Sequence, residues 1–150
     1  DLEILIPDSY VESITERLSL YSRLDNCKNE KELEALHKEM IDRFGPVPSE
    51  VEDLFTVVRC RKIALKLGFE KLILKNETLK GFFVANPDSA YFTGKTFEGI
   101  LDFIQTKTNK AKLKQAGRNG ILVVGDIKSM KDLSGFLQQM QANTFVEKEG

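Results

Sequence analysis

The residues whose types and spacing best suit binding or catalysis lie on one side of a helix predicted over residues 30–44. Apolar side chains recur there at helical spacing, which turns one face inward and leaves the opposite face to solvent. The outward residues, at spacings of three, four and three, are Glu32, Ala35, Glu39 and Asp42. With Arg43 beside it, such an acidic ridge can accept paired hydrogen bonds from arginines of another protein. The alternative is a solvated face with an ordinary i,i+4 pair between Glu39 and Arg43.

Catalysis and metal binding find little support in this sequence. His37 is the single histidine, and neither Leu33 nor Ile41, one helical turn away, can share a metal ion with it. A Gly-Lys-Thr tripeptide at residues 94–96 ends like a phosphate-binding loop, but Ser89 stands where that loop needs glycine. We therefore expect no enzymatic activity in this segment, and no metal or other cofactor.

The ridge must be positioned by neighbouring helices. Ser9 and Glu12 fit a capping box, which predicts that a first helix begins there and closes after residues 25 and 26. Its expected inward face consists of Tyr10, Ile14, Leu18 and Tyr21.

The turn after the ridge is set by residues that stop one helix and start another. Phe44 closes the apolar stripe, and Gly45 readily takes the left-handed conformation at which helices stop. Pro46 forbids continuation because it lacks an amide hydrogen and its ring clashes with the preceding turn. Pro48 suits the first turn of a third helix, which ends at Gly68.

The second half of the chain changes to a mixed pattern. Strands are predicted over residues 69–75, 80–85, 110–115 and 121–125, and helices over residues 95–106 and 129–143. Asn76 and Glu77 mark one tight turn, and the Arg-Asn-Gly at residues 118–120 marks another. The order β-β-α-β-β-α after three helices favours an α+β fold, with an antiparallel sheet and helices on one of its faces.

Composition bounds the class of protein. The chain has 150 residues with 22 basic and 23 acidic side chains, a balance unlike the basic excess of a duplex-binding module. Cys27 and Cys60 have no metal-binding spacing and fit a reducing compartment. No apolar run reaches the roughly 20 residues that span a bilayer. We expect a single interaction domain, helical over residues 1–68 and mixed over residues 69–150, from a longer chain.

A second candidate surface is the lysine-rich segment at residues 107–118. Its alternation places Lys110, Lys112 and Lys114 on one face of a strand, where they could contact the phosphates of a nucleic acid. The alternative is an edge strand guarded by lysines against pairing with another chain. The absence of interleaved aromatic residues favours this second interpretation.

Three strings in the first 50 residues resemble the C-terminal domain of the bacterial transcription-repair coupling factor. They are IPDSY at residues 6–10, RLSLYSRL at residues 17–24 and EMIDRFGPVP at residues 39–48. Beyond Gly68 the resemblance lies in the order of strands and helices.

The resemblance implies a regulatory domain without catalytic activity. The full-length family protein is an ATP-dependent DNA translocase that removes stalled RNA polymerase and recruits excision repair, and its motor lies outside this segment. The family's C-terminal domain docks on a UvrB-like module of the same protein and covers the surface that binds UvrA. Contacts with DNA come through other domains, and the expected location is the bacterial cytoplasm.

The resemblance also assigns roles to residues. Glu39 and Asp42 would be the acidic partners of arginines on the UvrB-like module, with Glu32 on the same ridge. Arg43 would share the interface or hold Glu39 in place. Neither Glu39 nor Asp42 has an evident architectural duty in the sequence, whereas Arg17 and Tyr21 are expected to be structural.

Overall fold

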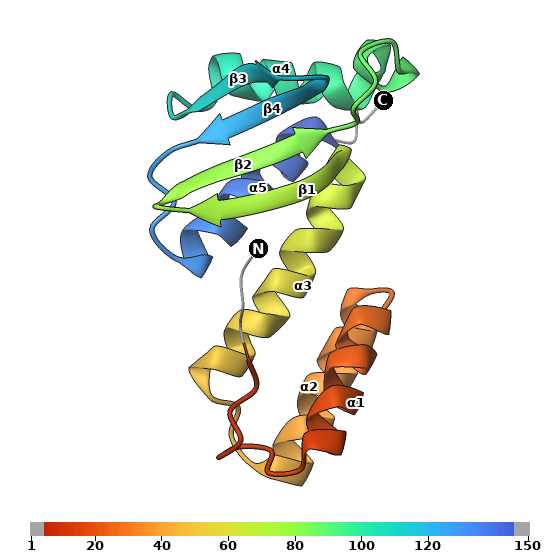
Figure 1. Ribbon diagram of the computed structural model, residues 1–150, viewed down its shortest axis with the longest axis vertical. Coiled ribbons are helices and arrows are strands. Elements are labelled where there is room, and N and C mark those ends of the chain that lie inside the picture. The colour runs from red at the N-terminus through yellow and green to blue at the C-terminus, as the bar shows by residue number, and fades with distance from the viewer. Residues whose placement is uncertain (1–4, 146–150) are drawn as a thin grey trace, which may run out of the picture. The chain divides into compact units, whose positions relative to one another are not determined.

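The structure, a computed structural model, describes residues 5–145, and it forms two compact units that divide within α3 between Arg59 and Cys60 (Figure 1). The helices are α1 (Ile14–Asn26), α2 (Glu30–Phe44), α3 (Ser49–Leu67), α4 (Lys95–Thr106) and α5 (Met130–Thr144). The strands are β1 (Phe69–Lys75), β2 (Thr78–Phe83), β3 (Ala111–Ala116) and β4 (Asn119–Val124). A short 3-10 helix, η1 (Ala90–Thr93), precedes α4. This α+β order is the one that the sequence predicted.

The helical unit buries the inward residues of α1, α2 and the first part of α3 in one apolar cluster. Leu33, Leu36 and Met40 of α2 are at most 3% exposed, as their spacing predicted. They pack in a cluster that also contains Leu20, Leu24, Val51, Phe55 and Val58. Because burying each such side chain stabilises the fold by about 1.5–3 kcal/mol, the stripe fixes how α2 is rotated about its axis.

The first helix begins later than the sequence predicted. Its N-cap is Ser13, whose hydroxyl accepts a hydrogen bond from the amide of Glu16 at 3.3 Å. Ser13 and Glu16 repeat, one turn later, the four-residue pattern of Ser9 and Glu12. Spacing alone did not separate the two possible starts. In the structure, the carbonyl of Pro7 accepts hydrogen bonds from two following amides and holds the earlier segment in a turn.

The buried residues of α1 differ in part from those predicted. Leu20 and Leu24 lie in the core, whereas the predicted inward residues Ile14 and Leu18 are 66% and 63% exposed. Tyr10 lies before the helix, and its hydroxyl donates to a backbone carbonyl just after α2 at 2.9 Å. The predicted inward face was therefore wrong for Ile14 and Leu18, whereas Tyr10 and Tyr21 are partly buried against the apolar cluster.

The connection between α2 and α3 follows the sequence prediction. Gly45 caps α2 with a φ of +89°, and its amide donates to the carbonyl of Ile41 at 2.9 Å. The carbonyl of Pro48 accepts the first helical hydrogen bonds of α3 at 3.0 Å. Gly45 and the two prolines of this turn are thus architectural.

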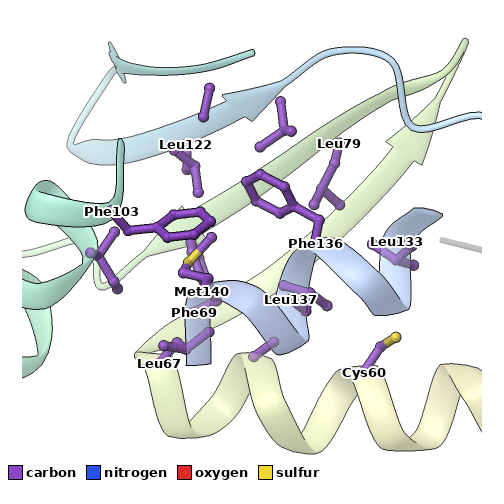
Figure 2. Close-up of a cluster of buried hydrophobic side chains, with 14 of the residues drawn as sticks. Cys60, Leu67, Phe69, Leu79, Phe103, Leu122, Leu133, Phe136, Leu137 and Met140 are labelled. Carbon is purple, nitrogen blue, oxygen red and sulfur yellow. The ribbon is translucent and has the colours of Figure 1, made fainter. Parts of the chain in front are cut away.

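The second unit contains a four-stranded antiparallel sheet in the order β1-β2-β4-β3. α4 and α5 contribute to the same apolar cluster as the inward residues of the sheet, and Figure 2 shows Phe103 and Phe136 from these helices packed beside Leu122. Their rings lie 5.6 Å apart, edge to face. The prediction of helices on one face of the sheet is confirmed.

The strand boundaries shift slightly from those predicted. β2 begins at Thr78 rather than residue 80, because Asn76 and Glu77 form the whole turn, both with positive φ. The second hairpin turns at Gly117 and Arg118, one residue earlier than predicted, and Gly117 has a φ of +61°.

The end of α3 depends on a glycine pressed against an aromatic ring. Gly68 has a φ of +95°, and a methyl group added there would lie 2.2 Å from the ring of Tyr91. The Tyr91 hydroxyl donates to the carbonyl of Leu67 at 2.5 Å, which holds the ring in this position. Burial also raises the pKa of Tyr91 well above its ordinary value. No side chain can replace Gly68 without moving this ring.

We predict that Gly68→Ala destabilises the protein more than Gly45→Ala does. Both substitutions meet a strained positive φ, which costs about 1–2 kcal/mol, but an added methyl at Gly45 has no atom within 4 Å. Thermal unfolding followed by circular dichroism measures both costs. In a Tyr91→Ala background the cost of Gly68→Ala should fall to the strain alone. An unchanged cost in that background would contradict the role of the ring.

Candidate docking surface of the helical unit

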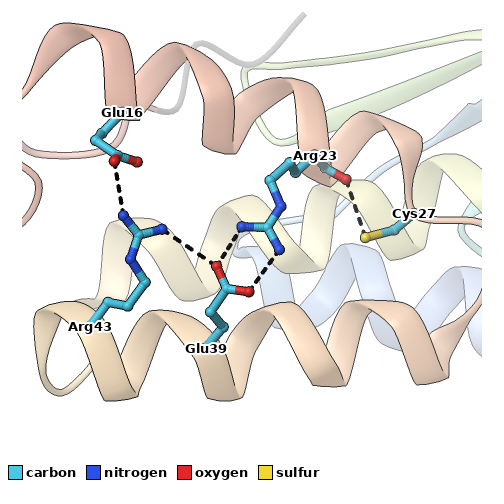
Figure 3. A network of polar contacts seen from close by, with 5 residues as sticks. All are labelled: Glu16, Arg23, Cys27, Glu39 and Arg43. Carbon is cyan, nitrogen blue, oxygen red and sulfur yellow. Dashed lines mark hydrogen bonds and ion pairs between the residues drawn. The ribbon is translucent and has the colours of Figure 1, made fainter.

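The predicted ridge on α2 meets α1 through a network of charged side chains (Figure 3). Arg23 of α1 binds both carboxylate oxygens of Glu39, with Nη1–Oε2 at 2.5 Å and Nη2–Oε1 at 2.8 Å. Arg43 lies 3.4 Å from the same carboxylate and donates to Glu16 of α1 at 2.9 Å. The four residues therefore join α1 to α2 on the solvent side of their apolar contact.

Glu39 is thus bound within its own unit. The hydrogen bond from Arg23 lowers the pKa of Glu39 from 4.5 to about 2, and the contact raises the pKa of Arg23. The expectation that Glu39 has no architectural duty was wrong. Its partners lie on another helix, where spacing along α2 cannot reveal them.

Arg23 and Glu16 were not identified from the sequence, although one signal was available. In an antiparallel helical hairpin, early residues of the first helix face late residues of the second. The charges of Glu16 and Arg23 complement those of Arg43 and Glu39 in that reversed order. Reading this signal requires knowing that α1 and α2 pack side by side.

Glu32 also has a local duty. The amide of Glu32 donates to the side chain of the N-cap residue Asn29 at 2.9 Å, and the amide of Lys28 donates to the Glu32 carboxylate at 2.5 Å. This arrangement resembles a capping box, but the Glu32 carboxylate accepts from the residue before the N-cap rather than from the N-cap itself. Glu32 therefore starts the helix, whatever else it contacts.

Asp42 is the member of the ridge that is left available. It is exposed, and among residues 5–145 it has no hydrogen bond or ion pair. Arg43 beside it lies over the ring of Phe44, 4.7 Å from the ring centre, so the guanidinium is held on the surface near the helix end. Asp42 is the carboxylate that can accept hydrogen bonds without first losing a partner.

A shallow, open depression of about 350 Å³ lies beside the ridge. Its lining includes Arg23, Glu32, Ala35, Leu36 and Glu39. The small side chain of Ala35 leaves space for this depression between Glu32 and Glu39. The depression combines a small apolar floor with charged sides, which suits a long side chain such as arginine better than a metal ion or a small substrate.

The structural role expected for the RLSLYSRL string is confirmed. Arg17 donates to the carbonyl of Val11 at 2.6 Å, and the Tyr21 hydroxyl accepts a hydrogen bond from the amide of Ile6 at 2.6 Å. Both side chains fasten the segment before α1 to the helix.

The remaining titratable groups form no catalytic arrangement in the part of the chain that is described. Nε2 of His37 lies 2.6 Å from Glu52, and its ring meets Phe55 edge to face. Burial raises the pKa of the Cys60 thiol to about 11, which makes it a poor nucleophile. No group of three potential metal ligands occurs among residues 5–145. The Gly-Lys-Thr tripeptide opens α4 after η1, without the strand that leads into a phosphate-binding loop.

The predicted lysine face is only partly formed. Lys112 and Lys114 are exposed on β3, an edge strand of the sheet. Lys110 precedes the strand, and its ammonium lies 5.6 Å from the ring centre of Phe136 on α5. The placement of Lys110 with the other two was wrong, because the strand alternation begins only at Ala111.

The fold defines this protein as an α+β domain with three helices followed in sequence by an antiparallel sheet that has helices on one face. A crystal structure of the C-terminal domain of a transcription-repair coupling factor matches with a TM-score of 0.75, at 17% identity, covering 99% of this chain and 92% of that one. The family model for the TRCF domain matches residues 1–93. The chain therefore belongs to the TRCF domain family.

Curated relatives agree with this assignment. The transcription-repair-coupling factor of Rickettsia conorii is 38% identical over 113 residues, covering 75% of this chain and 9% of the relative. The protein of the same name from Escherichia coli is 43% identical over 68 residues, covering 45% and 6%. That of Bacillus subtilis is 29% identical over 145 residues, covering 89% and 12%. The chain thus spans only about a tenth of the length of the first of these relatives. Among the described residues, no helix has the length and apolarity to cross a membrane.

We predict that the contribution of Glu39 to stability depends on pH. Because its pKa falls from 4.5 to about 2 in the folded state, the stabilisation is full above pH 4.5 and disappears as pH falls toward 2. The difference in melting temperature between the wild type and Glu39→Gln should therefore be largest near neutral pH and shrink over that window.

Glu34 supplies the matched control for this experiment. It is exposed on the same helix and has no ion pair in the described part of the chain. Glu34→Gln should change the melting temperature little at any pH. A Glu39→Gln difference that stays constant from pH 7 to below pH 2 would show that the Arg23 contact does not stabilise the hairpin.

Proposed function

We propose that this chain is the non-catalytic C-terminal regulatory domain of a transcription-repair coupling translocase. In this proposal residues 1–150 act as one domain that docks on the UvrB-like module of the same protein and masks its UvrA-binding surface. The observation that carries the proposal is the unpartnered carboxylate of Asp42, beside the Glu39–Arg43 contact in a TRCF-family domain.

The residues of the ridge have different roles in docking. Asp42 accepts hydrogen bonds from an arginine of the partner, because it has no partner of its own in the described chain. Glu39 contributes to docking indirectly, because an arginine of the partner must share the Glu39 carboxylate with Arg23. Arg43 places a positive charge beside Asp42. Glu32 borders the depression, which receives the side chain of the partner's arginine. Phe44, Gly45, Pro46 and Pro48 set the helix end that presents these residues.

Such an interface is suited to being closed and reopened. Exposed charge pairs are worth at most about 1 kcal/mol each, so the contact is weak when the partner is a separate molecule. A tethered domain meets its partner at an effective concentration on the order of mM. A dissociation constant of about 30 µM would then leave the closed state favoured by roughly thirty to one. A competing partner can shift that ratio with modest binding energy.

The remaining activities belong to other parts of the full-length protein. ATP hydrolysis and DNA translocation would come from a motor outside this chain, and UvrA and RNA polymerase would act on the closed state indirectly. The domain itself needs no cofactor for docking, and the proposed setting is the bacterial cytoplasm.

We predict that Glu39→Arg combined with Asp42→Arg opens the full-length protein. The two reversals place like charges against the partner's arginines, and low salt leaves that repulsion unscreened. UvrA should then bind the variant at least about tenfold more tightly than it binds the wild type, as measured by pull-down or surface plasmon resonance.

A single reversal elsewhere on α2, which makes half of the double variant's change in net charge, tests whether the position of the reversed charge matters. Glu34→Arg should leave UvrA binding as it is in the wild type, because this position lies outside the ridge. Equal UvrA binding by the wild type and the double variant at low salt would refute docking through α2. Nanomolar binding of the isolated domain to a separate UvrB-like module would refute the weak, tethered contact.

A further inference from the structure

The sheet carries a second charged surface on the face opposite its helices. The strand registers align side chains in rows that cross all four strands in the order β1-β2-β4-β3. One row consists of Lys71, Phe82, Ile121 and Lys114. The next row consists of Ile73, Lys80, Val123 and Lys112. We call these eight residues the outer face.

In the first row of the outer face two apolar residues lie between two lysines, whereas in the second row Lys80 lies on the central strand β2 and Ile73 on the edge strand β1. Phe82 and Ile121 lie on the two central strands, and Lys71 and Lys114 end their row at both edges of the sheet. All four lysines of the outer face are exposed, as is Lys75 at the end of β1. None of these five lysines has an ion-pair partner among residues 5–145. The surface therefore has one sign of charge and no internal compensation.

The helices α4 and α5 pack with the residues on the inner face of the sheet. The core cluster to which α4 and α5 contribute contains Leu79, Phe83, Leu122 and Val124, which alternate with the outer-face residues along β2 and β4. Figure 1 shows α5 crossing behind the sheet, with β1 and β2 in front of it. Ile73, Phe82 and Val123 remain only partly buried, whereas Ile121 is 7% exposed.

We propose that the outer face binds an amphipathic helix whose apolar stripe is flanked by Asp and Glu residues. An apolar centre with a charged rim is the anatomy of a protein–protein interface. Helices are the usual cover for a sheet face. A helix about 10 Å across covers two strands that lie about 4.8 Å apart, so its apolar stripe would lie over Phe82 and Ile121, and its carboxylates would reach Lys80 and the lysines at the sheet edges. This surface lies on the sheet, so the proposal is independent of docking through α2.

Single-stranded nucleic acid is the other polyanion that lysines attract, and the outer face fits it less well. Binding without sequence preference relies on successive bases stacked on aromatic rings. Phe82 is the single aromatic residue of the outer face, and the ammonium of Lys71 already lies 5.8 Å from its ring centre. The other apolar side chains of the outer face, Ile73, Ile121 and Val123, are aliphatic and offer no stacking platform.

A titration of the isotopically labelled 150-residue chain, followed by NMR, tests the proposal. The probes are a synthetic peptide of about 18 residues with a Leu stripe flanked by Glu, a scrambled peptide of the same composition, and an oligothymidylate of about 15 nucleotides. The striped peptide should shift the amide signals of β2 and β4 and saturate. The scrambled peptide and the oligonucleotide should bind at least about tenfold more weakly.

Charge-reversal variants locate the binding. Lys80→Glu with Lys112→Glu should weaken the striped peptide at least about tenfold, whereas Lys128→Glu with Lys131→Glu, the same charge change off the outer face, should not. Preserved amide spectra of both variants show that each still folds. Equal binding of the striped and scrambled peptides would show that the outer face attracts acidic peptides only through non-specific charge, and this would overturn the proposal. Tighter binding of the oligonucleotide would overturn it in favour of a nucleic-acid site, and no binding by any probe would make the outer face a solvated surface.

Discussion

The burial of Leu33, Leu36 and Met40 is the constraint on which the surface of the helical unit depends. Once these side chains enter the core, the rotation of α2 is fixed, and every other residue of the helix has its place. The ridge containing Glu39 and Asp42 is a consequence of that burial rather than a separate feature. An equal number of charged residues on a helix free to rotate would present no defined surface to a partner.

The contacts between charged residues orient the side chains but add little to the stability of the fold. Arg23 and Glu39 are both substantially exposed, at 44% and 38% of their side-chain surface, so solvent screens their contact. Their value lies in geometry, because a two-point contact between guanidinium and carboxylate fixes both side chains. Asp42, held on the same helix end without a partner, gives the unit one carboxylate ready for an intermolecular contact. A weak and well-defined surface of this kind is what the proposed regulatory function requires, because the proposed contact must be released as well as formed.

The net charge of −1 conceals two surfaces of opposite sign. The helical unit carries the acidic ridge, and the sheet carries the lysines of the outer face. Each surface is built on a rigid element whose other side is buried, which keeps the charges in fixed positions. The two proposals assign these surfaces to two different partners, one rich in arginine and one rich in carboxylates.

The sequence by itself determined the bounds of α2, β1 and α4, because apolar periodicity, Gly45 and Gly68 act locally. It also identified the family through the strings in the first 50 residues. It misplaced the start of α1, since Ser9 and Ser13 head the same capping pattern and only the turn after Pro7 distinguishes them. The partners of Glu39 and the rows of the outer face were decided by tertiary structure. Both depend on which residues of distant segments lie opposite one another, and that register is set by packing, which spacing along one segment does not contain.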